Sequence, residues 1–123
     1  MDARLYFVPH DSDGSATFYQ SELLVPANSI VELPDVVERR FGRDHTRGAL
    51  RIETDGPELL ATSRIYTGNS TAGTFGQFVQ GYVFGEGLAH GESTWLLQLR
   101  QQQGEFRTNI SVANPGSAPA EVE

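Results

Sequence analysis

Hydrophobic and polar residues alternate with a period of two along much of the chain. The clearest case is residues 106–112, where one face would carry Phe106, Thr108, Ile110 and Val112. Successive side chains of a β-strand point to opposite faces of the sheet, so this alternation predicts a half-buried strand.

Several other segments show the same alternation or are rich in β-branched and aromatic residues, which favour strands. They are residues 5–8, 18–25, 50–53, 59–67 and 95–100. Turn-forming sequences separate them: "DSDG" at 11–14, "TDGP" at 54–57, "TGNSTAG" at 67–73, "QQGE" at 102–105 and "NPGS" at 114–117. Short strands joined by such turns predict an all-β fold, an antiparallel sandwich or barrel.

Two segments depart from this pattern. "LPDVVERRFG" at 33–42 places Pro34 where the first turn of a helix tolerates it and Gly42 where a helix commonly ends. It predicts one short helix or 3₁₀ turn that links two strands. Residues 73–92 carry six glycines and predict a long, partly irregular crossing segment.

The chain has the size of one domain, so residues 1–123 are expected to form a single β-sandwich domain with its own core. Because there is no cysteine, disulfides, thiol catalysis and thiolate metal sites are excluded. The compartment is not fixed by that absence, since many exported proteins also lack cysteine.

Charge and hydropathy exclude two classes of partner. The formal net charge is −7 and no basic run occurs, whereas nucleic-acid binding needs clustered Lys and Arg. No apolar run approaches the roughly 20 residues that span a bilayer. The first residues, "MDARLYFVPH", lack the basic and apolar regions of a signal peptide. Neither nucleic acid nor a membrane span is expected.

No catalytic or metal site is expected. "DSDG" does not fit a calcium loop, because Pro9 and Gln20 stand where EF-hand ligands would be required. A hairpin turn is the preferred interpretation. His10, His45 and His90 lack metal-ligand spacing, and no serine lies in a nucleophile-elbow motif. No enzyme activity or cofactor is predicted. A hydrolase would require histidines that converge with serine or carboxylates in a cleft.

Aromatic residues between positions 75 and 84 are the strongest candidates for ligand binding. Aromatic faces flanked by amides stack on sugars or apolar ligands, and the candidates are Phe75, Gln77, Phe78 and Tyr82. The preferred interpretation is that these aromatics plug one end of the sandwich, with glycines that allow close backbone approach. Trp95, in an alternating segment, is expected in the core.

Several stretches taken together resemble a repeat domain of large secreted bacterial proteins that has no assigned activity. They are "VELPDVVERRFG", "GALRIETDGPELLATSRIYT", "GTFGQFVQG" and "FRTNISVANPGSAPAEVE". The resemblance runs from about Ile30 to the end, with Phe75 where the pattern often has tyrosine and Gln80 where it often has proline. It implies an immunoglobulin-like β-sandwich without catalytic residues.

The resemblance also implies a function and a location. The expected function is a non-catalytic structural or interaction module, adhesive or spacer, of an extracellular or cell-surface bacterial protein. The alternative is a carbohydrate- or small-ligand-binding module that uses the aromatic end loop.

The order of the matching pieces is shifted relative to that family. Joining "APAEVE" at the end to "DARLYFVPHDSDG" at the start gives one continuous strand, so the chain has the register of a circular permutant. In the preferred arrangement the C-terminal strand folds back onto its own sandwich. In the other it pairs with a neighbouring molecule, which gives a homo-oligomer through terminal strand pairing.

Overall fold

A computed structural model describes residues 2–56, 58–66, 76–83, 85–97, 99–104, 110 and 112–121. In these residues the protein is all-β, with antiparallel sheets and one short helix, as the sequence predicts. The chain divides into two compact units, Met1–Leu59 and Leu60–Glu123. The single domain, and the closure of the sheets into a sandwich, stay predictions.

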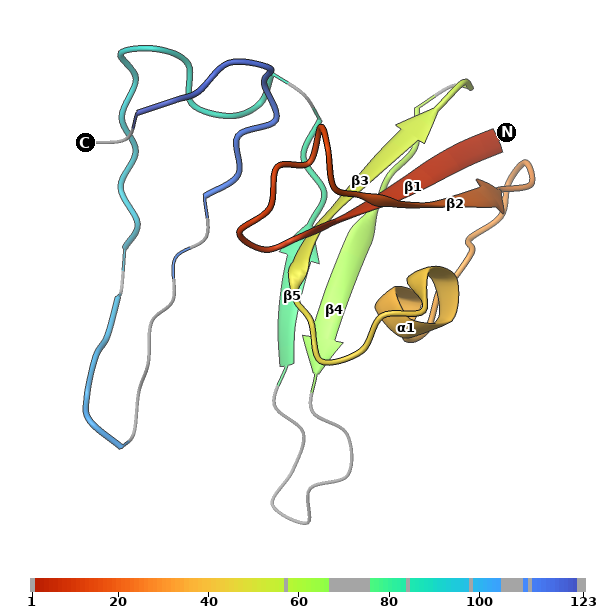
Figure 1. The fold of residues 1–123 in the computed structure, drawn as a ribbon, viewed down its shortest axis with the longest axis horizontal. Helices are drawn as coiled ribbons and strands as arrows, with labels where there is room; N and C mark the ends of the chain where they lie inside the picture. Colours follow the sequence, from red (N-terminus) through yellow and green to blue (C-terminus); the bar gives the residue numbers. More distant parts are fainter. Residues whose placement is uncertain are drawn as a thin grey trace. The chain divides into compact units, whose positions relative to one another are not determined.

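The first unit contains a three-stranded antiparallel sheet in the order β2-β1-β3 (Figure 1). The strands are β1 at Asp2–Pro9, β2 at Tyr19–Leu24 and β3 at Gly48–Thr54. Leu5 faces Ser21 on one side and Ile52 on the other. The first strand of the chain is therefore the central strand of its sheet.

The alternation along β1 gives this sheet one buried face. Ala3, Leu5 and Phe7 lie on that face, and Leu5 and Phe7 are 0 % and 2 % exposed. The Phe7 ring lies 5.8 Å from the ring of Phe41, in the helix, and 6.5 Å from the ring of Tyr19. In the described residues the buried hydrophobic side chains are Ala3, Leu5, Tyr6, Phe7 and Val25.

The opposite face of the sheet is aromatic and charged. The Arg51 guanidinium lies 4.5 Å from the centroid of the Tyr6 ring, its cross-strand neighbour. Phe18 makes an edge contact with the same ring at 5.6 Å, and Arg51 also pairs with Glu53 at 3.4 Å. These contacts cover Tyr6 and leave the charged ends of the side chains in water.

The predicted helix is confirmed as α1, Val36–Phe41, between β2 and β3. Gly42 ends it with a φ of 62°, and its N–H donates to the Glu38 carbonyl at 2.8 Å. Only glycine adopts this left-handed conformation at little cost. Arg39 pairs with Asp35 at 3.5 Å, one helical turn away.

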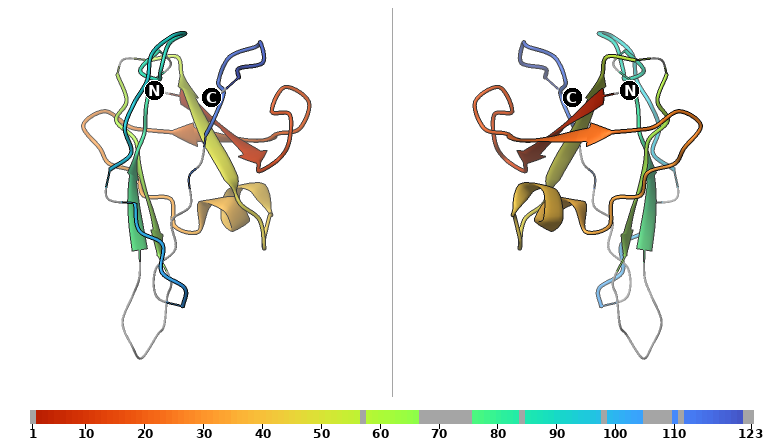
Figure 2. Two further views of the ribbon diagram at one scale, coloured as in Figure 1. Left: turned by 90° about the vertical axis from the view of Figure 1, so that its left-hand side faces the viewer. Right: turned by 90° about the vertical axis from the view of Figure 1, so that its right-hand side faces the viewer.

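The second unit contains a two-stranded antiparallel ribbon, β4 at Thr62–Tyr66 and β5 at Gly76–Gln80. The two strands lie side by side in both views of Figure 2. All ten residues of the β4–β5 ribbon are exposed. The structure describes no other strand in this unit.

Four predicted strand segments, residues 5–8, 18–25, 50–53 and 59–67, overlap β1, β2, β3 and β4. β5 falls within the segment predicted to be partly irregular, and the described residues after it, 81–83 and 85–92, form no strand.

The strand predicted at residues 95–100 is not found among the described residues. Residues 95–97 and 99–100 do not form the expected strand, and Trp95 is 86 % exposed, so its assignment to the core is wrong. No described strand pairs with this segment, and alternation alone cannot bury a side chain. Most of the strand predicted at 106–112 lies outside the described residues.

Candidate functional site

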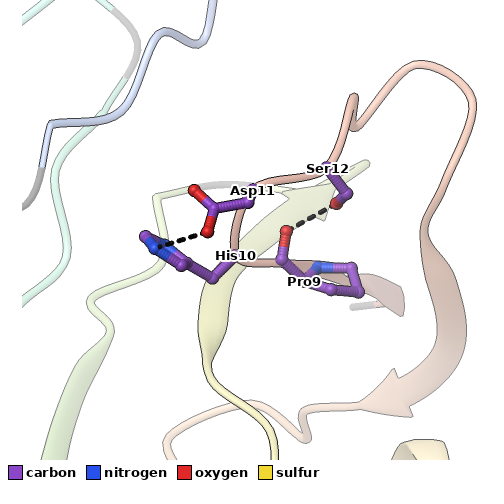
Figure 3. Close-up of polar contacts among 4 residues, drawn as sticks. All are labelled: Pro9, His10, Asp11 and Ser12. Atoms are coloured by element: carbon purple, nitrogen blue, oxygen red, sulfur yellow. Dashed lines mark hydrogen bonds and ion pairs between the residues drawn. The ribbon is translucent and has the colours of Figure 1, made fainter.

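The "DSDG" segment forms the turn between β1 and β2, as predicted (Figure 3). His10 Nε2 lies 3.1 Å from Asp11 Oδ2, and the Ser12 hydroxyl donates to the Pro9 carbonyl at 2.5 Å. In a Ser-His-Asp triad the histidine accepts the serine proton. Here His10 pairs with Asp11 and the Ser12 hydroxyl donates to a carbonyl, so the cluster lacks the serine-to-histidine hydrogen bond of a triad.

Asp13 stabilises the same turn. Its carboxylate accepts hydrogen bonds from the Ser15 hydroxyl at 2.6 Å and the Ser15 N–H at 2.9 Å. These two bonds, the hydroxyl first, hold the pKa of Asp13 below its ordinary value of 3.8 because they favour the charged form. Asp13 Oδ1 thus stabilises the turn through both the hydroxyl and the backbone N–H of Ser15.

The other histidines do not create a metal site in the described chain. His45 pairs with its neighbour Asp44 at 2.9 Å and is largely exposed. The described residues contain no group of three or more His, Cys, Asp or Glu side chains that could hold a metal ion.

The candidate ligand-binding residues lie on or near β5, but the strand does not bring them to one face. Gln77 and Phe78 are consecutive in β5, so their side chains point to opposite faces. Tyr82 lies two residues beyond the strand and is 77 % exposed, and Phe78 is 66 % exposed. Phe75 lies outside the described residues. The exposure of Phe78 and Tyr82 contradicts the interpretation that they plug a closed core.

The register places two further residues beside Phe78. Arg64 of β4 faces Phe78 directly, and Tyr66 lies two residues from Arg64 on the same face. The Arg64 guanidinium lies 5.4 Å from the Tyr66 ring centroid. We call the surface formed by Arg64, Tyr66 and Phe78 the aromatic face. It combines the exposed rings of Tyr66 and Phe78 with the Arg64 guanidinium, which its contact with the Tyr66 ring orients.

Charge is scarce around this face. From Leu59 to Gly85 the sequence contains no Asp or Glu, and Arg64 is the single charged residue, in a chain whose formal net charge is −7. No carboxylate within the described residues pairs with Arg64.

Sequence reasoning missed Arg64 and Tyr66. Both lie in a segment recognised as a strand, "SRIY", with no feature of its own that suggests binding. The signal that identifies them is the pairing of β4 with β5, and pairing depends on a register that the sequence alone does not supply.

The second edge of β5 has a defined hydrogen-bonding pattern. The Gly81 N–H donates to the Ala61 carbonyl at 2.9 Å, which continues the register of β4 with β5. Hydrogen-bonded and non-hydrogen-bonded pairs alternate in an antiparallel ladder, so Gln77 and Val79 bond to β4. The backbone groups of Gly76, Phe78 and Gln80 then point away from β4.

No strand in the described residues pairs with that second edge of β5. By contrast, β1 has a partner on both sides, so the N-terminal strand does not present the open edge that terminal strand pairing would need. The described C-terminal residues, 110 and 112–121, form no strand.

The described helix is far too short to cross a membrane, and none of the described residues form a longer apolar one. Comparison with models of known protein families, with curated proteins and with solved structures found no match to this chain.

Proposed function

We propose that this chain is a non-catalytic interaction module, adhesive or spacer, of an extracellular bacterial protein, and that it binds other proteins through exposed sheet surfaces. The observation that carries the proposal is the exposure of the β4–β5 ribbon on both faces. Ile65 on one face is 69 % exposed, and Phe78 on the other is 66 % exposed.

Exposed apolar surface of this kind favours binding over catalysis. Water contact with large apolar side chains costs free energy that a partner surface recovers, and contiguous exposed patches mark interaction sites. The near absence of charge between Leu59 and Gly85 also favours contact, because few charges need to be desolvated. The extracellular location rests on the resemblance to secreted repeat domains.

Bead adhesion tests this function. Beads are coated with the chain, and the force that detaches them from surfaces coated with extracellular proteins is measured. A double variant, Ile65→Ser with Phe78→Ser, is expected to lower adhesion at least fivefold. The control, Leu24→Ser with Ile30→Ser, removes two apolar side chains of the first unit that are 62 % and 98 % exposed, and it should leave adhesion unchanged. Equal adhesion of both variants, or turnover of a substrate by the chain, would overturn the proposal.

Carbohydrate binding is the second candidate, and the aromatic face favours it. Rings beside a cation and amides suit a sugar ring, which stacks on the aromatics and accepts hydrogen bonds. Polysaccharide-coated surfaces in the same assay separate the two functions. The sugar-binding function predicts adhesion to polysaccharide that Tyr66→Ala abolishes, whereas adhesion confined to protein-coated surfaces excludes it.

A further inference from the structure

The edge of β5 that faces away from β4 has no partner strand among the described residues. We propose that a second copy of this chain pairs with it, β5 to β5 and antiparallel, about a twofold axis that passes between the two Phe78 residues. The product is a four-stranded sheet in the order β4-β5-β5-β4 across the two molecules. The proposal rests on the interaction function above and names its partner.

Hydrogen-bond geometry is the first argument. The outward backbone groups on β5 belong to Gly76, Phe78 and Gln80. A twofold axis at Phe78 sets Phe78 opposite Phe78 and Gly76 opposite Gln80 of the second copy. Every outward residue then faces another outward residue, as the hydrogen-bonded pairs of an antiparallel ladder require.

The distribution of charge favours pairing of β5 with β5 over pairing of β4 with β4. The segment Gly76–Gln80 has no charged residue and no proline, so it lacks the features with which proteins protect an open edge. Pairing of β4 with a second β4, centred in the same way, would set Arg64 opposite Arg64. Like charges directly opposite each other destabilise a sheet.

Side chains support the same arrangement. The two Phe78 rings would meet at the centre of the new sheet, each flanked by Arg64 of its own chain, which extends the aromatic face across both molecules. On the opposite face Gln77 would stand across from Val79 of the second copy. Gln80 would face Gly76 of the second copy, which has no side chain and leaves space for the side chain of Gln80.

The small size of the β4–β5 sheet is a further reason to expect a partner strand. A two-stranded ribbon is marginally stable in water, and three or more strands are required for independent stability. The second unit supplies two strands within its described residues, and its described side chains contribute nothing to the buried set. Two copies paired through β5 form one four-stranded sheet, which exceeds the three strands needed for independent stability.

Sedimentation velocity from micromolar to millimolar chain is the first test, with dimer expected at the upper end. Phe78→Lys would set two cations opposite each other beside Arg64, and Gln80→Pro would remove an outward N–H without breaking the ladder to β4. Each should weaken dimerisation at least tenfold. Ile30→Lys, which adds the same charge at a position 98 % exposed in the first unit, should not.

Cysteine cross-linking locates the contact. The chain has no cysteine, so Phe78→Cys introduces one thiol per molecule. Hydrogen-bonded antiparallel pairs hold their Cα atoms about 5.5 Å apart, within the range that a disulfide spans. Mild oxidation should give covalent dimer from Phe78→Cys at least ten times faster than from Ile30→Cys.

Two outcomes would overturn the inference. One is a chain that stays monomeric up to millimolar concentration. The other is a dimer in which Phe78→Cys cross-links no faster than Ile30→Cys, which would place the contact elsewhere. A monomer that still adheres to protein-coated surfaces through the β4–β5 ribbon would contradict self-pairing and leave the proposed function standing.

Discussion

Burial in this protein is concentrated in a few side chains of one strand. Leu5 and Phe7 are the largest side chains that are almost fully buried in the described residues, and they lie two residues apart on the same face of β1. Phe7 connects β1 to β2 through Tyr19 and to α1 through Phe41. One aromatic side chain therefore joins three elements of the first unit.

Truncation of Phe7 is expected to be severe. Phe7→Ala removes a buried ring and leaves a cavity between sheet and helix, which should lower the free energy of unfolding by about 3–5 kcal/mol. Urea unfolding followed by circular dichroism measures the change. The control is Ile30→Ala, at a position 98 % exposed, which is expected to stay within about 0.5 kcal/mol of the wild type. A loss of similar size in both variants would refute the assignment of the core.

At the scale of elements, the junction of β1 and β3 depends on close backbone approach. Gly48 begins β3 opposite Pro9. A Cβ atom at this position would lie 2.1 Å from the Val8 carbonyl oxygen and 2.9 Å from the Phe7 ring. The first of these contacts is with backbone, so a side-chain rotation cannot relieve it.

Gly48→Ala should therefore weaken the first sheet, by roughly 1–3 kcal/mol as for other overpacked sites. Thermal and urea unfolding of the variant measure the loss. Gly87→Ala is the matched control, because a Cβ there meets nothing within 4 Å and its φ is not positive. If Gly48→Ala matched that control in stability, the register of β1 with β3 would need revision.

The elements that could be predicted from sequence are those specified by local chemistry. The helix was predictable because Pro34 and Gly42 mark its ends, and the first hairpin because "DSDG" supplies Asp13 to the turn. The exposure of Trp95 was not predictable, because burial depends on which element covers a side chain. Arg64 and Tyr66 were missed for a related reason: pairing between strands, which no local pattern encodes, brings them beside Phe78.

At the scale of the whole molecule, protection from solvent is uneven between the two units. All five buried hydrophobic side chains among the described residues belong to the first unit. Local stability follows buried contacts and backbone pairing. The two units are therefore expected to open at different rates.

Hydrogen exchange should show this difference residue by residue. Amides of β1 from Ala3 to Phe7, with strands on both sides, should exchange slowest. In dilute solution the outward amides of Phe78 and Gln80 should exchange much faster than those of Gln77 and Val79. Nuclear magnetic resonance measures the exchange rates of the β1 amides and of the β5 amides. Uniform protection across the two units would contradict the uneven distribution of the core.

The central position of β1 also has a practical consequence for handling the protein. Chain ends usually tolerate trimming, because few contacts hold them. Here four of the five buried side chains, Ala3, Leu5, Tyr6 and Phe7, lie within the first eight residues. An exopeptidase that removed this short stretch would take away most of the core and the strand that joins β2 to β3.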